Sequence, residues 1–212
     1  MLKKGECATS LVLEFVSCVV KNLPEVPDDV MDGWVKNPKA LQKALHVLCP
    51  PETASERPGL LRRIATTTAT GVQRFVCDDE ALKAANIGWT GKNFKAHFLD
   101  KVEEGVSDAV VVVHRLERAS PDVPILAELG NRAEIQLAHF FALLQKQSKG
   151  EDGLLLVNGG YANVAYIKGN NGSVWAVGAC WDSGFQFWGV EALSFGYPFW
   201  WRDGSQVLSR DS

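Results

Sequence analysis

The C-terminal stretch from Gly153 to Ser212 concentrates aromatic side chains and alternates apolar runs with turn-forming residues. It holds five of the seven tryptophans, and before Trp201 its only charged residues are Lys168, Asp182 and Glu191. Turns such as Asn158-Gly159-Gly160 join strands into hairpins, because Asn and Gly tolerate positive φ. A stretch so poor in charge is typical of a sheet with one face packed on a core. We therefore predict an antiparallel β-meander of about four to six strands over residues 153–209.

Before residue 153, the sequence indicates helices in the N-terminal part and a mixture of helices and strands after it. Pro27-Asp28-Asp29 suits the first turn of a short helix, and Leu41, Leu45 and Leu48 form an apolar stripe at helical spacing. We expect a helical N-terminal segment over residues 1–50, with a proline-rich linker over residues 51–59.

From Leu60 onward, β-branched and apolar runs alternate with helical patterns. Strands are predicted at residues 64–68, 87–89 and 109–113, and helices at residues 71–82, after Thr90, and at residues 132–146. Prolines at positions 121 and 124 predict a loop. The overall prediction is an α+β protein whose domain spans residues 60–212. In it, a mixed α/β middle leads to a long helix packed on the C-terminal antiparallel meander.

Composition excludes several classes of protein. The chain has 22 Lys and Arg against 25 Asp and Glu, a formal net charge of −3, which argues against a nucleic-acid-binding protein. The five cysteines have no metal-ligand spacing and suggest no disulfide framework. The apolar run Leu11–Val20 is interrupted by Glu14 and is shorter than a membrane span. We expect a cytoplasmic protein with no membrane contact, no metal and no cofactor.

Catalytic motifs are absent from the sequence. It has no nucleophile elbow, no P-loop, no H-E-x-x-H and no dinucleotide-binding glycine pattern. A site assembled from residues far apart in sequence remains an alternative, and its candidates are His114 and His139 with the carboxylates Glu128 or Glu134. Both histidines lie in apolar surroundings, which also suits a structural histidine with satisfied hydrogen bonds.

The aromatic residues of the meander are the remaining candidates for function. With few basic neighbours, most of Trp175, Trp181, Phe185 and Phe187 are expected in the core. Trp188 has the opposite parity to Phe187, so it should point to the other face and help to form an exposed apolar patch. Such patches mark partner contacts. The residues predicted to bind a partner are Trp188, Phe199, Trp200, Trp201 and Arg202.

Several strings of residues from about Leu60 to the C-terminus resemble a family of small bacterial proteins of unknown function. They are the run from His114-Arg-Leu-Glu through Pro124-Ile-Leu-Ala-Glu-Leu-Gly130, the run from Ala142-Leu-Leu to Lys149-Gly-Glu, Leu155-Leu-Val-Asn-Gly, and Ala162-Asn-Val-Ala-Tyr-Ile. The resemblance implies no activity, cofactor or catalytic residue.

Three hypotheses of function follow from these patterns. The first is a non-catalytic module that uses its aromatic sheet to bind a protein partner or a second copy of itself. The second is a hydrolase or transferase built on His114, His139 and nearby carboxylates. The third, a nucleic-acid-binding protein, would require binding that weakens steeply with salt.

Overall fold

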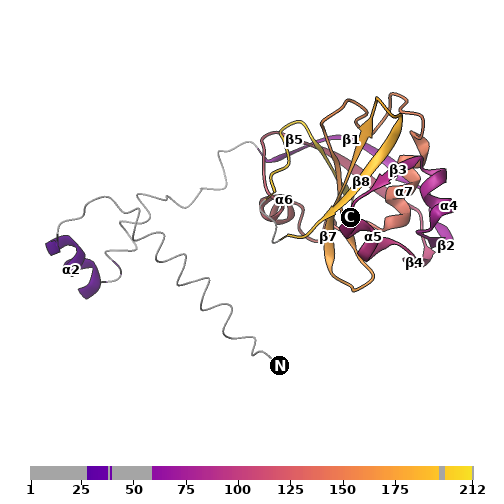
Figure 1. Cartoon of the computed structure of the whole chain (residues 1–212). Coiled ribbons are helices and arrows are strands. Elements are labelled where there is room, and N and C mark those ends of the chain that lie inside the picture. The colour runs from indigo at the N-terminus through magenta and orange to yellow at the C-terminus, as the bar shows by residue number, and fades with distance from the viewer. Residues whose placement is uncertain (1–27, 38, 40–58, 196–198, 212) are drawn as a thin grey trace. The chain divides into compact units, whose positions relative to one another are not determined.

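The computed structural model describes residues 28–37, 39, 59–195 and 199–211 (Figure 1). The chain divides into two units, residues 1–57 and 58–212. In the first unit, α2 (Asp28–Lys36) begins at the position predicted from Pro27-Asp28-Asp29. The helices predicted around residues 1–20 and 41–48 lie outside the described residues. None of the described helices is long and apolar enough to cross a bilayer.

A mixed sheet forms the centre of the second unit (Figure 1). It has seven strands in the order β1-β5-β9-β6-β7-β8-β3. Its strands are β1 (Leu61–Ala69), β3 (Ile87–Thr90), β5 (Ala109–Leu116), β6 (Asn163–Lys168), β7 (Val174–Asp182), β8 (Phe187–Leu193) and β9 (Gln206–Arg210). The pairs β6–β9 and β3–β8 are parallel, and the other neighbours are antiparallel. The α+β class is therefore observed, but its sheet is mixed.

Helices cover the two faces of this sheet unequally. Helices α4 (Asp79–Ala84), α5 (Lys92–Phe98) and α7 (Leu137–Lys146) lie on one side, and α6 (Asp122–Leu129) lies on the other (Figure 1). Strand alternation divides the core in the same way. On β6, Ala165 and Ile167 join the cluster that contains the α7 side chains, whereas Val164 and Tyr166 join the cluster that contains α6. A second, two-stranded sheet pairs β2 (Val72–Val76) with β4 (Val102–Val106).

Two parts of the predicted meander fold differently. Residues 154–157 form no strand, because side chains satisfy their backbone: Gln147 bonds both polar groups of Leu155, and Asn163 bonds both polar groups of Leu156. Trp201 does not form a hairpin with β9. Its backbone pairs instead with Ser120, and β9 inserts between β5 and β6.

Three predictions in the middle of the chain also need correction. Residues 72–76 are strand β2 where a helix was expected, and α4 starts only after Asp78, whose side chain caps it. The expected loop at residues 120–124 instead opens α6, since prolines in a first helical turn cost no intrahelical hydrogen bond. Helix α7 begins at Leu137, later than expected, because Ile135 donates its amide proton to the carbonyl of Tyr166 in β6.

Candidate binding groove on the open face of the sheet

A groove lies on the sheet face that carries α6, over the strands β7, β8 and β3. Its volume is about 730 Å³, and it is lined mainly by apolar atoms around a floor that includes Gly178, Cys180 and Gly189. The aromatic residues that line it are Trp89, Trp181, Phe185, Phe187, Phe199 and Trp201. Pockets that bind small ligands or peptide side chains have a similar size and apolar lining. The groove is therefore the main candidate binding site in the described part of the chain.

Glycines within the strands allow the aromatic side chains to lie across neighbouring backbone. A Cβ at Gly88 would collide with the ring of Phe187, and a Cβ at Gly178 would come within 3.0 Å of the Trp201 ring. Glycine inside a strand lowers its stability but permits such close approach. The shape of the groove thus depends on these residues having no side chain.

The Trp201 wall of the groove is anchored in the core by a buried carboxylate. Asp122 Oδ1 accepts hydrogen bonds from Trp201 Nε1 at 2.7 Å and from the Tyr166 hydroxyl at 3.0 Å. Burial raises the pKa of Asp122, and the two hydrogen bonds oppose that shift. The ring of Phe199 packs edge-on against Trp201, with 4.9 Å between ring centroids. These contacts fix the orientation of the Trp201 ring at the side of the groove.

Glu191 adds a carboxylate to the residues that line the groove. It lies on β8 opposite Gly178 of β7, and a Cβ at Gly91 would collide with its carboxylate. Its Oε1 accepts a hydrogen bond from the amide of Ala192 at 2.9 Å. Among the described residues, no lysine or arginine lines the groove and no ion pair includes Glu191.

The other two titratable groups of the groove are Asp182 and Cys180. Asp182 Oδ1 accepts hydrogen bonds from the amides of Gly184 at 2.9 Å and Phe185 at 3.0 Å, which closes the turn from β7 to β8. Burial raises the pKa of the Cys180 thiol, so the thiol is protonated at neutral pH. A protonated thiol is a poor nucleophile.

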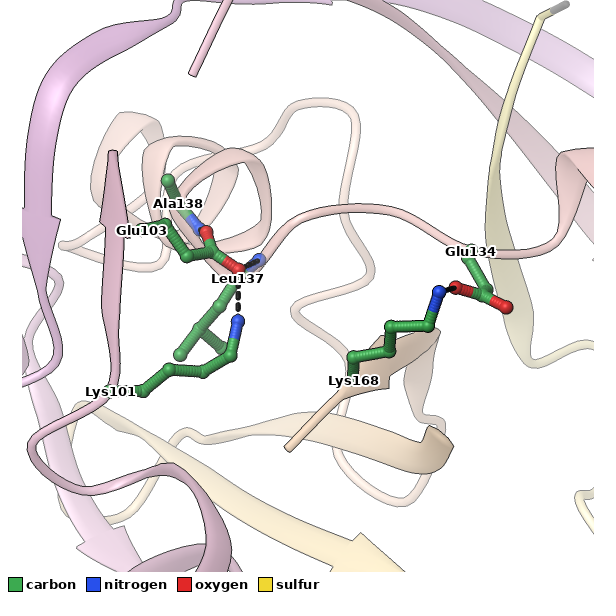
Figure 2. A network of polar contacts seen from close by, with 6 residues as sticks. All are labelled: Lys101, Glu103, Glu134, Leu137, Ala138 and Lys168. Carbon is green, nitrogen blue, oxygen red and sulfur yellow. Dashed lines mark hydrogen bonds and ion pairs between the residues drawn. The ribbon is translucent and has the colours of Figure 1, made fainter. Parts of the chain in front are cut away.

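A second, polar pocket of about 600 Å³ lies at the start of α7. There Glu103 of β4 accepts hydrogen bonds from the backbone amides of Leu137 at 3.1 Å and Ala138 at 2.8 Å, and it also pairs with Lys101 (Figure 2). Separately, Lys168 Nζ lies 2.8 Å from Glu134 Oε2 (Figure 2). Glu103 therefore caps the N-terminus of α7, although it belongs to strand β4 and not to the helix or the residues just before it.

The two histidines proposed for catalysis lie apart. His114 of β5 donates from Nε2 to the Ser209 hydroxyl at 2.9 Å, on the α6 side of the sheet. Burial, then Arg132 and Arg63, lowers its pKa. His139 is on α7, which covers the opposite face, and its Nε2 donates to the Ser107 carbonyl at 2.8 Å. Each imidazole is thus held by its own structural hydrogen bond.

The two carboxylates expected to assist these histidines are engaged elsewhere. Glu128 accepts hydrogen bonds from the amides of Leu60 at 2.8 Å and Leu61 at 3.0 Å, at the start of β1. Glu134 pairs with Lys168. Within the described part of the chain, no hydrogen bond joins either histidine to either carboxylate, and no cluster of metal-ligating side chains is present.

The five residues predicted to bind a partner fall in different environments. Trp188 is completely buried and donates from Nε1 to the Gln147 carbonyl at 3.2 Å, so its predicted exposure is wrong. Trp201 is also buried apart from the edge that lines the groove. Phe199 and Trp200 are exposed. Arg202 is exposed too, with its guanidinium 5.4 Å from the ring centroid of Tyr161.

Parity was predicted correctly for β8, but the faces were assigned the wrong way round. Trp188 and Phe187 do point to opposite faces, and Phe187 is the one that lines the open groove. Phe185, expected in the core, is 76% exposed. The sequence does contain a signal for the groove, namely the glycines at positions 88, 178 and 189 within strands. Glycine in a strand marks a place where another group approaches the backbone closely.

Comparisons with known proteins provide no assignment: no protein-family model, no curated protein and no solved structure matches this chain.

Proposed function

We propose that the protein is a non-catalytic interaction module that binds a segment of a partner protein in the aromatic groove. The observation that carries this proposal is the apolar hollow itself. Helix α6 buries the part of this sheet face formed by β5, β9 and β6, whereas the part formed by β7, β8 and β3 keeps its aromatic side chains open to solvent. Trp89 is 52% exposed there. Open aromatic surfaces of this kind mark sites of protein contact.

The chemistry of the groove favours binding over catalysis. Its thiol has a raised pKa, Asp182 is engaged in a turn, and both candidate histidines lie elsewhere. The absence of lysine and arginine from the lining argues against a phosphate-bearing nucleic acid as the ligand, because such ligands need basic side chains.

A selection from a library of displayed linear peptides tests the proposal. The full chain is immobilised, and the selected peptides are synthesised and measured against wild type and Gly189→Val. A Cβ at position 189 would make ordinary contacts of 3.5 Å with Trp89 and 3.9 Å with the Cys180 carbonyl, so the strand accepts a side chain there. The valine methyl groups then fill the floor of the groove. We expect peptides that bind wild type and lose at least tenfold in affinity on Gly189→Val.

Two matched controls separate the groove from other surfaces. Thr68→Val introduces the same side chain on β1, the strand at the opposite edge of the sheet, and should leave affinity unchanged. Trp89→Ala should weaken binding, whereas Trp200→Ala removes a similarly exposed ring that does not line the groove and should not. Selected peptides that bind Gly189→Val as well as wild type would refute the proposal.

A further inference from the structure

The charge distribution of the groove identifies the chemistry of its occupant. Resting on the function proposed above, we infer that the bound segment presents an arginine side chain, which stacks on the aromatic wall and pairs with the carboxylate of Glu191.

The first argument is the unbalanced charge of Glu191. Its carboxylate is half-buried at the side of the groove, against Gly91 at the start of α5, and a partly buried ion is stabilised by an opposite charge. In the described part of the chain its hydrogen-bond partner is the neighbouring Ala192 amide, and no cation lies within ion-pair distance. A carboxylate has about four lone-pair sites, so Glu191 retains unused acceptor capacity. A positively charged ligand group would supply the missing partner.

The second argument is the aromatic surface around that carboxylate. Trp89 and Phe187 line the same hollow as Glu191, and all three side chains come from the adjacent strands β3 and β8. A cation placed over an aromatic face is attracted by the ring quadrupole, most strongly for tryptophan. The planar guanidinium group of arginine stacks on such rings and also pairs with carboxylates through two hydrogen bonds, which the compact ammonium group of lysine does not do.

A protein segment suits the groove better than a free cation. The groove is mainly apolar and is larger than any one side chain. Its second carboxylate, Asp182, is the last residue of β7 and bonds to the turn that follows. An arginine with apolar neighbours in the chain would satisfy Glu191 and also cover the remaining aromatic surface. A free cation would leave that surface exposed.

The test uses the selected peptides and two variants of Glu191. We expect an arginine at a fixed position in the peptides that depend on the groove. Replacing it with citrulline, which has the same shape without the charge, should weaken binding to wild type about tenfold or more. Lysine at that position should bind with intermediate affinity. Glu191→Gln should abolish the difference between arginine and citrulline, and Glu191→Lys should select peptides with Asp or Glu at that position.

Each outcome separates this inference from the function on which it rests. Peptides that depend on the groove but show no preference for arginine would overturn the inference and leave the proposed function standing. Peptides that keep the preference in Glu191→Gln would overturn the role of Glu191. If no selected peptide depends on the groove, both fail. If N-acetyl-arginine amide binds as tightly as the peptides, the site takes a free cation. That result would contradict the inference that the ligand is a protein segment.

Discussion

The buried ion pair between Lys101 and Glu103 makes the most quantitative prediction of this structure. Glu103 is bonded to Lys101 and to the first two amides of α7, and the two side chains are only 12% and 8% exposed (Figure 2). Glu103→Ala leaves a buried ammonium group without its partner and two helix amides without an acceptor. Removing one member of a buried pair costs about 3–5 kcal/mol. That is a large fraction of the ~5–15 kcal/mol that stabilises a typical domain.

The pair formed by Glu134 and Lys168 is the matched control for this change. It has the same residue types and lies by the same pocket, but its lysine and glutamate are 60% and 41% exposed. Solvent screens such a pair, so Glu134→Ala should cost below about 1 kcal/mol. The ratio of the two costs therefore tests whether burial sets the energy of these pairs.

Urea unfolding followed by circular dichroism and tryptophan fluorescence measures both costs, provided that the slope with denaturant is unchanged. The double variant Lys101→Met/Glu103→Leu removes the uncompensated charge. We expect it to recover most of the lost stability and to retain a deficit of about 0.5–2 kcal/mol from the uncapped α7. A Glu103→Ala chain as stable as Glu134→Ala would refute the reasoning.

Three further predictions concern titratable groups. Because burial raises the pKa of Asp122, the unfolded chain releases this proton first, and the free energy of unfolding should fall as pH rises from about 3.8 through the raised pKa. A pH series of urea melts should show this loss in wild type and not in Asp122→Asn; parallel curves would contradict it. His114 has a lowered pKa, so stability should fall as pH decreases from about 6.5 through the folded-state pKa, and His114→Gln should lack this decrease in the same melts. The raised pKa of Cys180 should make its alkylation by iodoacetamide at pH 8 slower in the folded chain than in urea, and a groove-binding peptide should slow it further. Peptide mapping by mass spectrometry follows this one thiol, and equal rates in the folded and unfolded chain would show that it is fully accessible.

Local signals predicted the elements that depend on local interactions. The turn between β6 and β7 contains Asn170-Asn171-Gly172, a turn-forming sequence like Asn158-Gly159-Gly160, and Gly172 has a positive φ of 76°. The strand predicted at residues 109–113 is part of β5, where Val111, Val112 and Val113 are completely buried and Val110 is exposed. Such features follow from turn chemistry and strand period alone.

Long-range interactions decided the elements that were predicted wrongly. Residues 154–157 have the composition of a strand, but the side chains of Gln147 and Asn163, not the backbone of a neighbouring strand, bond to their backbone. Their side-chain amides imitate a neighbouring strand, and no pattern within residues 154–157 reveals this. The candidate groove was missed for a related reason. The alternation of side chains along β8 shows which residues share a face of the sheet. The position of α7 decides which of the two faces is covered, and the sequence of β8 does not contain that information.

Strand β9 has a consequence for how the domain is made. Among the described strands, it alone joins the pair β1–β5 to the group β6–β7–β8–β3. Until residues 206–210 have been synthesised, β5 and β6 each present an unpaired edge, and unpaired edges recruit other chains. The nascent protein therefore carries two unpaired strand edges from the completion of β6 until β9 is made, and closing the sheet is a late step that joins segments distant in sequence. A variant that ends before Gln206 and so lacks β9 should form two separate half-sheets that are prone to aggregation.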